Sequence, residues 1–403
     1  MKVNCGKKFA SVPRSAEITP DLVAARWRLI GAPEDAQCAL LDAEAMRQMA
    51  QYQHRIENFI GTVKVPVGIA GPLRVRGTHA NGDYYVPLAT TEAALVASYS
   101  RGAGLISAAG GCRTAVLEEA IGRAPGFAFQ TLDEACAFVA WLRHRPEELA
   151  AVAAQTSRYC RLLDTRTRIE GNHVYVNFEF ATGDAAGQNM VTFASEALMQ
   201  HIEQHSPVQP RYAFIEVNHS GDKKASARAL QGVRGRRVVA EVTIPADDVR
   251  NTLHTDPKCM AEYWRMGAIG CALSGTTGIQ GQYANALAAI YLACGQDVAC
   301  VAESATGITR FELTEDRALY AAVTLPNVLV GTVGGGTSLP SQRASLAIMG
   351  LEGPGNAGAL AEICAAACLS GELSLVGALC AGEFARAHRN LARPMRAPES
   401  IPR

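Results

Sequence analysis

Apolar residues recur at intervals of three and four over residues 20–30 and again over about 40–55, which predicts two helices near the start of the chain. The pattern changes over residues 57–73, where the sequence ENFIGTVKVPVGIAGPL contains three glycines and two prolines. Glycine and proline at this density interrupt helices and favour a loop with short strands. The chain is therefore expected to begin with helices that lead into an irregular segment.

A further helix is expected after Thr90 and Thr91, because threonine commonly caps the first turn of a helix. Glu92 follows these two residues and is expected to lie in that first turn. The helix is expected to end near Gly102 or Gly104, since glycine is a poor helix former.

The middle of the chain, about residues 125–213, has a different pattern. Apolar spacing predicts helices over 132–143 and 147–155, and the sequence HVYVNFEFA alternates as a half-buried strand does. Another helix is expected after Gly187. This stretch is typical of a small α+β unit.

The last part of the chain combines strands with Ala-rich helices. The runs RYAFIEVN and RRVVAEVTIP predict strands on either side of an exposed loop, SGDKKASA. Helices are expected over 260–273, 282–294 and 357–388, and the glycine cluster VGTVGGGTSLP separates the last two. Together these elements favour an α+β fold with more than one domain.

Composition excludes several classes of function. The 403 residues include 38 Lys and Arg and 38 Asp and Glu, so no overall field favours nucleic acid or an anionic membrane. No uninterrupted run of 18 apolar residues and no signal peptide is evident, which predicts a soluble, cytoplasmic protein. The 12 cysteines form no CxxC pairs, so we expect reduced thiols and no structural zinc or other metal.

Two short motifs are weak when taken alone. Gly353, Gly355 and Gly358 match GxGxxG, but a helical pattern precedes them where a dinucleotide-binding Rossmann site needs a strand. His201 and His205 have a spacing that suits zinc, yet no third ligand is evident, so a solvated helix face is the better interpretation. Neither motif decides the function.

Four further residues also have ordinary explanations when considered singly. Lys223 and Lys224 are typical of solvated loop charges, Asp297 of a helix cap and His388 of a surface histidine.

The order of the motifs around these four residues is more informative. The blocks ENFIGTVKVPVGIAGPL, LATTEAALVAS, TGDAAGQNM, GDKKASA, ACGQD, VGTVGGGTSLP and a late Ala-His pair resemble the signature blocks of class I 3-hydroxy-3-methylglutaryl-CoA (HMG-CoA) reductases over about residues 57–390.

This resemblance implies a domain organisation. Residues 1–124 and 216–403 would form a large, helix-rich substrate domain, and residues 125–215 a small, inserted, ferredoxin-like α+β domain that binds NADP(H). The fold would contain no Rossmann domain. The protein would be a homodimer or a higher homo-oligomer with active sites at the subunit interface, and its substrates would be HMG-CoA and NADPH.

The four catalytic positions of the family fall on Glu92, Lys223, Asp297 and His388. Reduction of a thioester to an alcohol takes two hydrides and creates a developing alkoxide, which the Lys223 ammonium can stabilise. His388 suits protonation of the departing CoA thiolate. Glu92 can protonate the final alkoxide, and Asp297 would couple Lys223 and Glu92 in one network.

Other positions match the ligand-binding residues of the family. Ser157 and Arg158 fall where a Ser-Arg pair meets the ribose 2′-phosphate of NADPH, and an arginine fork suits phosphate. The alternative is an exposed pair at a helix end. The resemblance places the nicotinamide near Asp184, Gly187, Asn189 and Met190, and the HMG group near Arg123, Lys224, Arg265 and Asn285.

The sequence departs from the family pattern at several positions. Gln188 stands where methionine is common, QGQYAN over 280–285 lacks a usual histidine, and Glu216 replaces a small hydroxyl residue. An added carboxylate would repel an anionic acyl group unless a cation pairs with it. Two alternatives therefore stay open, the same chemistry on a different acyl-CoA and a non-catalytic CoA-binding homologue.

Overall fold

The computed structural model describes residues 11–15 and 17–385. His388, one of the predicted catalytic residues, lies outside the described residues. Within them, side chains pack into two hydrophobic clusters, a small one built from the first helices and a large one that runs through the rest of the chain.

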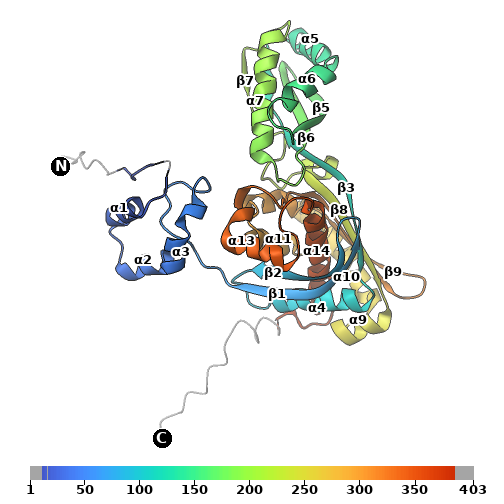
Figure 1. Cartoon of the computed structure of the whole chain (residues 1–403). Helices are drawn as coiled ribbons and strands as arrows, with labels where there is room; N and C mark the ends of the chain where they lie inside the picture. The colour runs from blue at the N-terminus through green and yellow to red at the C-terminus, as the bar shows by residue number, and fades with distance from the viewer. Residues whose placement is uncertain (1–10, 16, 386–403) are drawn as a thin grey trace, which may run out of the picture.

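The first group of elements is helical and lies beside the main body of the molecule (Figure 1). It comprises α1 (Pro20–Ile30), α2 (Glu34–Leu40), α3 (Ala43–Arg47) and the 3₁₀ helix η1 (Met49–Tyr52). Thr19 caps α1 by accepting a hydrogen bond from the Leu22 N–H, and Gly31 ends the helix in the left-handed conformation. Trp27 and Phe59 are buried in the small cluster.

The main body is a mixed sheet covered by helices. Its strands are β1 (Val67–Gly77), β2 (Asn81–Ala89), β3 (Cys112–Arg123), β8 (Gly235–Ile244), β9 (Ile308–Leu313) and β10 (Leu319–Val328). They lie in the order β2-β1-β3-β8-β10-β9, and every pairing is antiparallel except β1 with β3.

The longer helices of the main body are α4 (Leu95–Ala108), α9 (Ala246–Leu253), α10 (Pro257–Ser274), α11 (Tyr283–Cys294), α13 (Pro340–Ile348) and α14 (Ala357–Cys380). Short turns of helix are α8 (Arg228–Gln231), η2 (Val298–Cys300), α12 (Val301–Ser304) and η3 (Gly335–Ser338).

Helix α14 forms the centre of this body. It contacts α4, α11 and strands β3, β8 and β10, and nearly all of its residues are buried. The helix is long and apolar enough to cross a membrane, but 83% of its most apolar window is buried inside the molecule. A helix that is apolar on every side is typical of a protein core, so the packing accounts for this composition.

A second, smaller unit projects from one end of the body (Figure 1). Its elements follow the chain as β4 (Gly126–Ala128), α5 (Leu132–Arg143), α6 (Pro146–Ala154), β5 (Arg161–Glu170), β6 (His173–Ala181), α7 (Gln188–His205) and β7 (Tyr212–Phe214). The strands lie in the order β7-β4-β6-β5 and pair antiparallel. The last residues of β3 pair with β6, so β3 joins the two sheets.

The structure confirms the α+β expectation and most of the predicted helices. Helices α1, α5, α6 and α11 and strands β6 and β8 agree with their predicted ranges to within one residue. The second predicted helix, over 40–55, is instead divided into short pieces, since only α3 and η1 form there. Strands β2, β3, β4, β5, β9 and β10 were not predicted.

The prediction for the segment that carries Glu92 was wrong in two respects. Helix α4 begins at Leu95, so Glu92 lies before the helix, where its N–H donates to Thr90 Oγ1 at 3.0 Å. The helix also continues through Gly102 and Gly104 to Ala108. Only glycine fits at position 102, because a Cβ there would lie 1.9 Å from the Ser370 carbonyl oxygen of α14.

Candidate active site

A cleft of about 630 Å³ lies where the smaller unit meets the main body. Its wall includes the start of α7 with Gln188, Asn189 and Met190, together with Lys223 and Asp297. The glycine cluster before α13 forms another wall, where Gly334 and Gly335 have φ of 74° and 53°. Glycines leave backbone amides open to a ligand, and α7 adds a helix N-terminus, so the cleft suits an anionic ligand.

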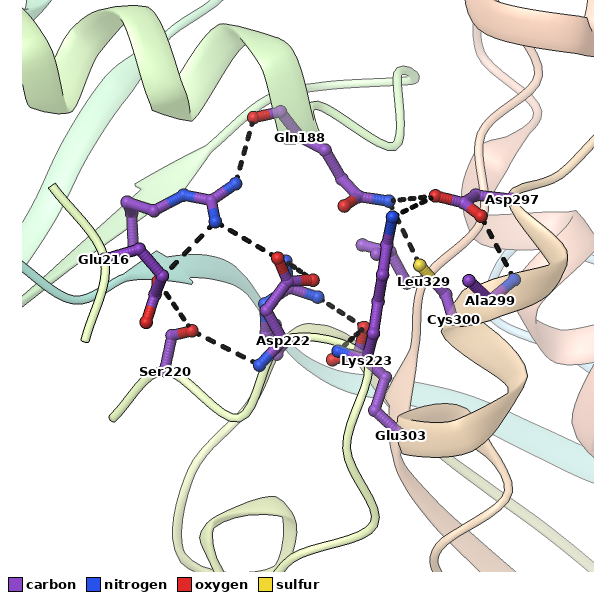
Figure 2. A network of polar contacts seen from close by, with 12 residues as sticks. Gln188, Glu216, Ser220, Asp222, Lys223, Asp297, Ala299, Cys300, Glu303 and Leu329 are labelled. Carbon is purple, nitrogen blue, oxygen red and sulfur yellow. Dashed lines mark hydrogen bonds and ion pairs between the residues drawn. The ribbon is translucent and has the colours of Figure 1, made fainter. Parts of the chain in front are cut away.

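Lys223 and Asp297 form an ion pair in this cleft, with Nζ 2.9 Å from Oδ2 (Figure 2). Lys223 comes from the loop before α8, and Asp297 caps η2 by accepting from the Ala299 N–H. Burial opposes ionisation of Asp297, but the hydrogen bond and charge of Lys223 hold its pKa below the usual value. The same hydrogen bond raises the pKa of Lys223. Both groups are therefore charged at neutral pH.

Gln188 links the smaller unit to this pair. Its Nε2 donates to Asp297 Oδ2 at 3.1 Å and lies 3.0 Å from Cys300 Sγ. The oxygen that it contacts is the one paired with Lys223. Gln188 therefore links the smaller unit to Asp297 by a hydrogen bond. A methionine at this position could not donate that hydrogen bond.

Behind the pair lies a chain of buried charges. Arg123, at the end of β3, has Nη1 3.1 Å from Asp222 Oδ2, and Arg234 Nη2 lies 2.7 Å from Asp222 Oδ1. Arg234 also contacts Glu303, which is fully buried and accepts the Lys223 N–H at 3.2 Å. Burial raises the pKa of Glu303, and Arg234 opposes that rise. This chain holds the Lys223 backbone, whose φ is 56°.

Glu92 lies apart from the ion pair of Lys223 and Asp297 in this polypeptide. Its Oε1 is 3.5 Å from Asn285 Nδ2, a residue predicted to bind substrate. Among the described residues, no hydrogen bond or ion pair joins Glu92 to Lys223 or Asp297. The structure thus brings together two of the four predicted catalytic residues and places Glu92 beside a predicted substrate residue.

The other predicted ligand residues have varied surroundings. Ser157 Oγ accepts the Tyr159 N–H, and the exposed Arg158 guanidinium lies 4.7 Å from the centre of the Tyr159 ring, on the smaller unit. Lys224 is exposed, with Nζ 3.0 Å from the Asp222 carbonyl oxygen. Arg265 is exposed on α10.

Asp184 has a contact that sequence reasoning did not predict. Its carboxylate accepts the N–H groups of Gly355 and Ala357, at 2.8 and 3.1 Å, and so ties the loop before α7 to the start of α14. Gly187, with φ of 77°, begins α7, and a Cβ there would lie 2.5 Å from Thr182. Gly187 lines the cleft, and Asp184 fixes the loop that leads to it.

Two charged residues of the site carried no signal in the sequence. Arg234 and Glu303 are 69 positions apart and are joined only by the fold. The histidine pair noted in the sequence has no such role, because His201 and His205 stack on each other and His201 contacts Glu148. Within the described residues, no group of three potential ligands is placed to hold a metal ion.

Comparison with known proteins supports a single family. A family model described as hydroxymethylglutaryl-coenzyme A reductase matches residues 22–393. The 3-hydroxy-3-methylglutaryl-coenzyme A reductase of Pyrococcus abyssi is 43% identical over 346 residues, which cover 84% of this chain and 84% of that protein. The enzyme of the same name from Aeropyrum pernix is 44% identical over 85% of this chain and 82% of its own length.

Solved structures agree on the fold. A structure described as the class II reductase of Streptococcus pneumoniae bound to NADPH matches with a TM-score of 0.66 and 22% identity, over 88% of this chain and 86% of that one. The narrower prediction of class I is not supported, since this structural neighbour is a class II enzyme and the sequence relatives are described without a class. The family model and the archaeal relatives nevertheless extend over most of the chain, which belongs to the hydroxymethylglutaryl-coenzyme A reductase family.

Proposed function

We propose that this protein reduces HMG-CoA to mevalonate and CoA with two molecules of NADPH. The observation that carries the proposal is the charged pair of Lys223 and Asp297 in a cleft walled by glycines. The relatives described as HMG-CoA reductases support the choice of substrate.

Lys223 is the group that stabilises negative charge on the reacting oxygen. Hydride addition to the thioester carbonyl carbon places charge on its oxygen, and a preorganised ammonium beside that oxygen lowers the barrier. The C–S bond then breaks, the oxygen electrons re-form a carbonyl, and CoA leaves as a thiolate that His388 protonates. A second hydride adds to the aldehyde, and Glu92 supplies the proton for the new alkoxide.

Asp297 and Gln188 position this ammonium. Asp297 Oδ2 lies between Lys223 Nζ and Gln188 Nε2, at 2.9 and 3.1 Å. Because Gln188 belongs to the smaller unit, movement of that unit would alter the setting of Lys223. Both residues are positioning residues, whereas Lys223 touches the reacting oxygen.

The residues around the cleft fit a reduced nicotinamide dinucleotide, which supplies hydride when bound. Gly187, Asn189 and Met190 at the start of α7 would hold the nicotinamide end, and Asp184 keeps that loop in place. Ser157 and Arg158 would hold the 2′-phosphate, since no carboxylate among the described residues pairs with Arg158. Residues 125–215 would then be the inserted NADP(H)-binding domain, and the succession of β4, α5, α6, β5, β6, α7 and β7 supports a ferredoxin-like fold for it.

The protein is further proposed to act as a homodimer in the cytoplasm, with α10 at the subunit interface. Met266, Ile269 and Leu273 occupy one face of α10 and are 75%, 63% and 84% exposed. A continuous apolar helix face of this kind is usually covered by a partner. Arg265, on the same helix, would then reach a site built by both subunits.

NADPH absorbance at 340 nm tests the function and the division of roles. With HMG-CoA, the wild-type chain should oxidise two NADPH for each mevalonate formed. Lys223→Ala should lower kcat at least about 10²-fold with both HMG-CoA and free mevaldehyde. His388→Gln should impair only the reaction of HMG-CoA, because mevaldehyde has no thiolate to expel. Equal loss of both reactions in the two variants would contradict these roles, and absence of turnover in the wild type would refute the function.

A further inference from the structure

Arg123 is already paired with protein carboxylates before any substrate binds. Its Nη1 lies 3.1 Å from Asp222 Oδ2 and 3.5 Å from Glu216 Oε2, and its Nη2 donates to Thr192 Oγ1 at 3.0 Å. The residue is only 8% exposed. A guanidinium held on two sides in this way has little free charge to offer a third carboxylate.

Glu216 is also held firmly in its place. Its Oε2 accepts from Ser220 Oγ at 2.9 Å and from the Ala124 N–H at 3.3 Å, in addition to its ion pair with Arg123. Its other oxygen, Oε1, is buried and has no hydrogen-bond partner in the described part of the chain. A buried acceptor without a donor is costly.

The charges around this point are balanced without a ligand. The cluster joins three cations, on Arg123, Lys223 and Arg234, to four carboxylates. The carboxylates belong to Glu216, Asp222, Asp297 and Glu303. The exposed Lys224 brings the sum to zero. Without Glu216, the three cations and three remaining carboxylates would cancel, and Lys224 would leave one net positive charge to attract an anion.

We propose that Glu216 is a specificity-determining residue, which takes up the positive charge of Arg123 and so weakens binding of acyl-CoA thioesters that carry a carboxylate, relative to those with an uncharged hydroxyacyl group. The inference rests on the proposed function, which places the reacting oxygen beside Lys223, and on the expected contact of Arg123 with the acyl group. It predicts that this chain discriminates less in favour of HMG-CoA than a variant with a neutral residue at position 216.

Two acyl-CoA compounds separate the carboxylate from the rest of the substrate. HMG-CoA carries the carboxylate, and 3-hydroxy-3-methylbutyryl-CoA has the same thioester and hydroxyl with hydrogen in its place. The change Glu216→Gln removes the charge and keeps an oxygen that can accept from Ser220 and the Ala124 N–H. Glu312→Gln, at a half-exposed glutamate paired with Arg310 on β9, is the matched control.

The dissociation constants are measured by calorimetry without NADPH, on the full chain, so the result does not depend on turnover. In Glu216→Gln, HMG-CoA should bind about tenfold more tightly, whereas the uncharged compound should change by less than about twofold. The KM of Glu216→Gln for HMG-CoA should fall together with the dissociation constant. The control Glu312→Gln should bind both compounds as the wild type does.

Three outcomes would overturn the inference: unchanged binding of HMG-CoA, weaker binding, or an equal change for both compounds. Glu216→Ser repeats the test if circular dichroism shows that the glutamine variant does not fold. A selective gain in binding without any NADPH oxidation by the wild type would support the inference and refute the proposed function. Oxidation of NADPH by the wild type with no selective gain in binding would support the proposed function and refute the inference.

Discussion

Lys223 and Asp297 show how one contact sets the charge of two residues. The ordinary pKa of the aspartate is 3.8 and that of the lysine 10.5, and the pair lowers the first and raises the second. Stability from Asp297 is therefore complete above pH 3.8 and is lost as the pH falls through the lowered pKa. Stability from Lys223 is complete below pH 10.5 and is lost as the pH rises through the raised pKa.

Asp297→Asn should accordingly lower the free energy of unfolding by a constant amount between about pH 5 and pH 9, and by less outside that range. The loss should stay below about 1 kcal/mol, because the two side chains are 42% and 41% exposed. Urea unfolding at a series of pH values measures it. In the Asp297→Asn background, Lys223→Met should have no further pH-dependent effect, and a loss that persists undiminished at pH 3 would contradict the ion pair.

At the scale of elements, the contact between α4 and α14 depends on a missing side chain. Gly102 lets the two helices approach so closely that a Cβ would lie 1.9 Å from the Ser370 carbonyl oxygen. Gly104, two residues further along α4, is exposed and has nothing within 4 Å of an added Cβ. Packing against α14 therefore requires glycine at position 102 but not at position 104, although both residues lie within the helix.

Gly102→Ala should destabilise the fold by about 1–3 kcal/mol, because α4 and α14 must move apart. Gly104→Ala should stabilise it by up to about 1 kcal/mol, because alanine favours the helix at an open position. Urea unfolding of the two variants measures both effects. Equal effects of the two substitutions would show that helix propensity, and not packing against α14, decides the stability here.

The exposed face of α10 leads to an expectation for the whole molecule. Gel filtration with light scattering should find the wild type as a dimer or a larger oligomer at micromolar concentration. Leu273→Glu places a charge at a residue that is 84% exposed, and should yield monomers that have lost activity. Leu132→Glu, at an apolar residue of α5 that is 53% exposed, should leave assembly unchanged. A monomeric wild type would remove the basis for an interfacial active site.

Local sequence patterns determined much of this protein. Helices α1 and α5 begin at threonine caps, and strand β6 forms where the alternating sequence predicts a strand, because capping and periodicity act over a few residues. The polar residues Asn177 and Glu179 are nevertheless buried in β6, which the alternation did not predict. The ordered motifs also indicated the family and the residues Lys223 and Asp297. These features need no knowledge of distant contacts.

Only the tertiary structure decided the features that depend on distant neighbours. Glycine in a sequence predicts a helix end, yet Gly102 lies within α4 because α14 occupies the space beside it. Glu216 could be noted as an added carboxylate, but its pairing with Arg123, 93 positions earlier, arises where β3 ends beside the loop before α8. The charge that a ligand meets is a sum over side chains brought together by the fold, and no local pattern in the chain contains that sum.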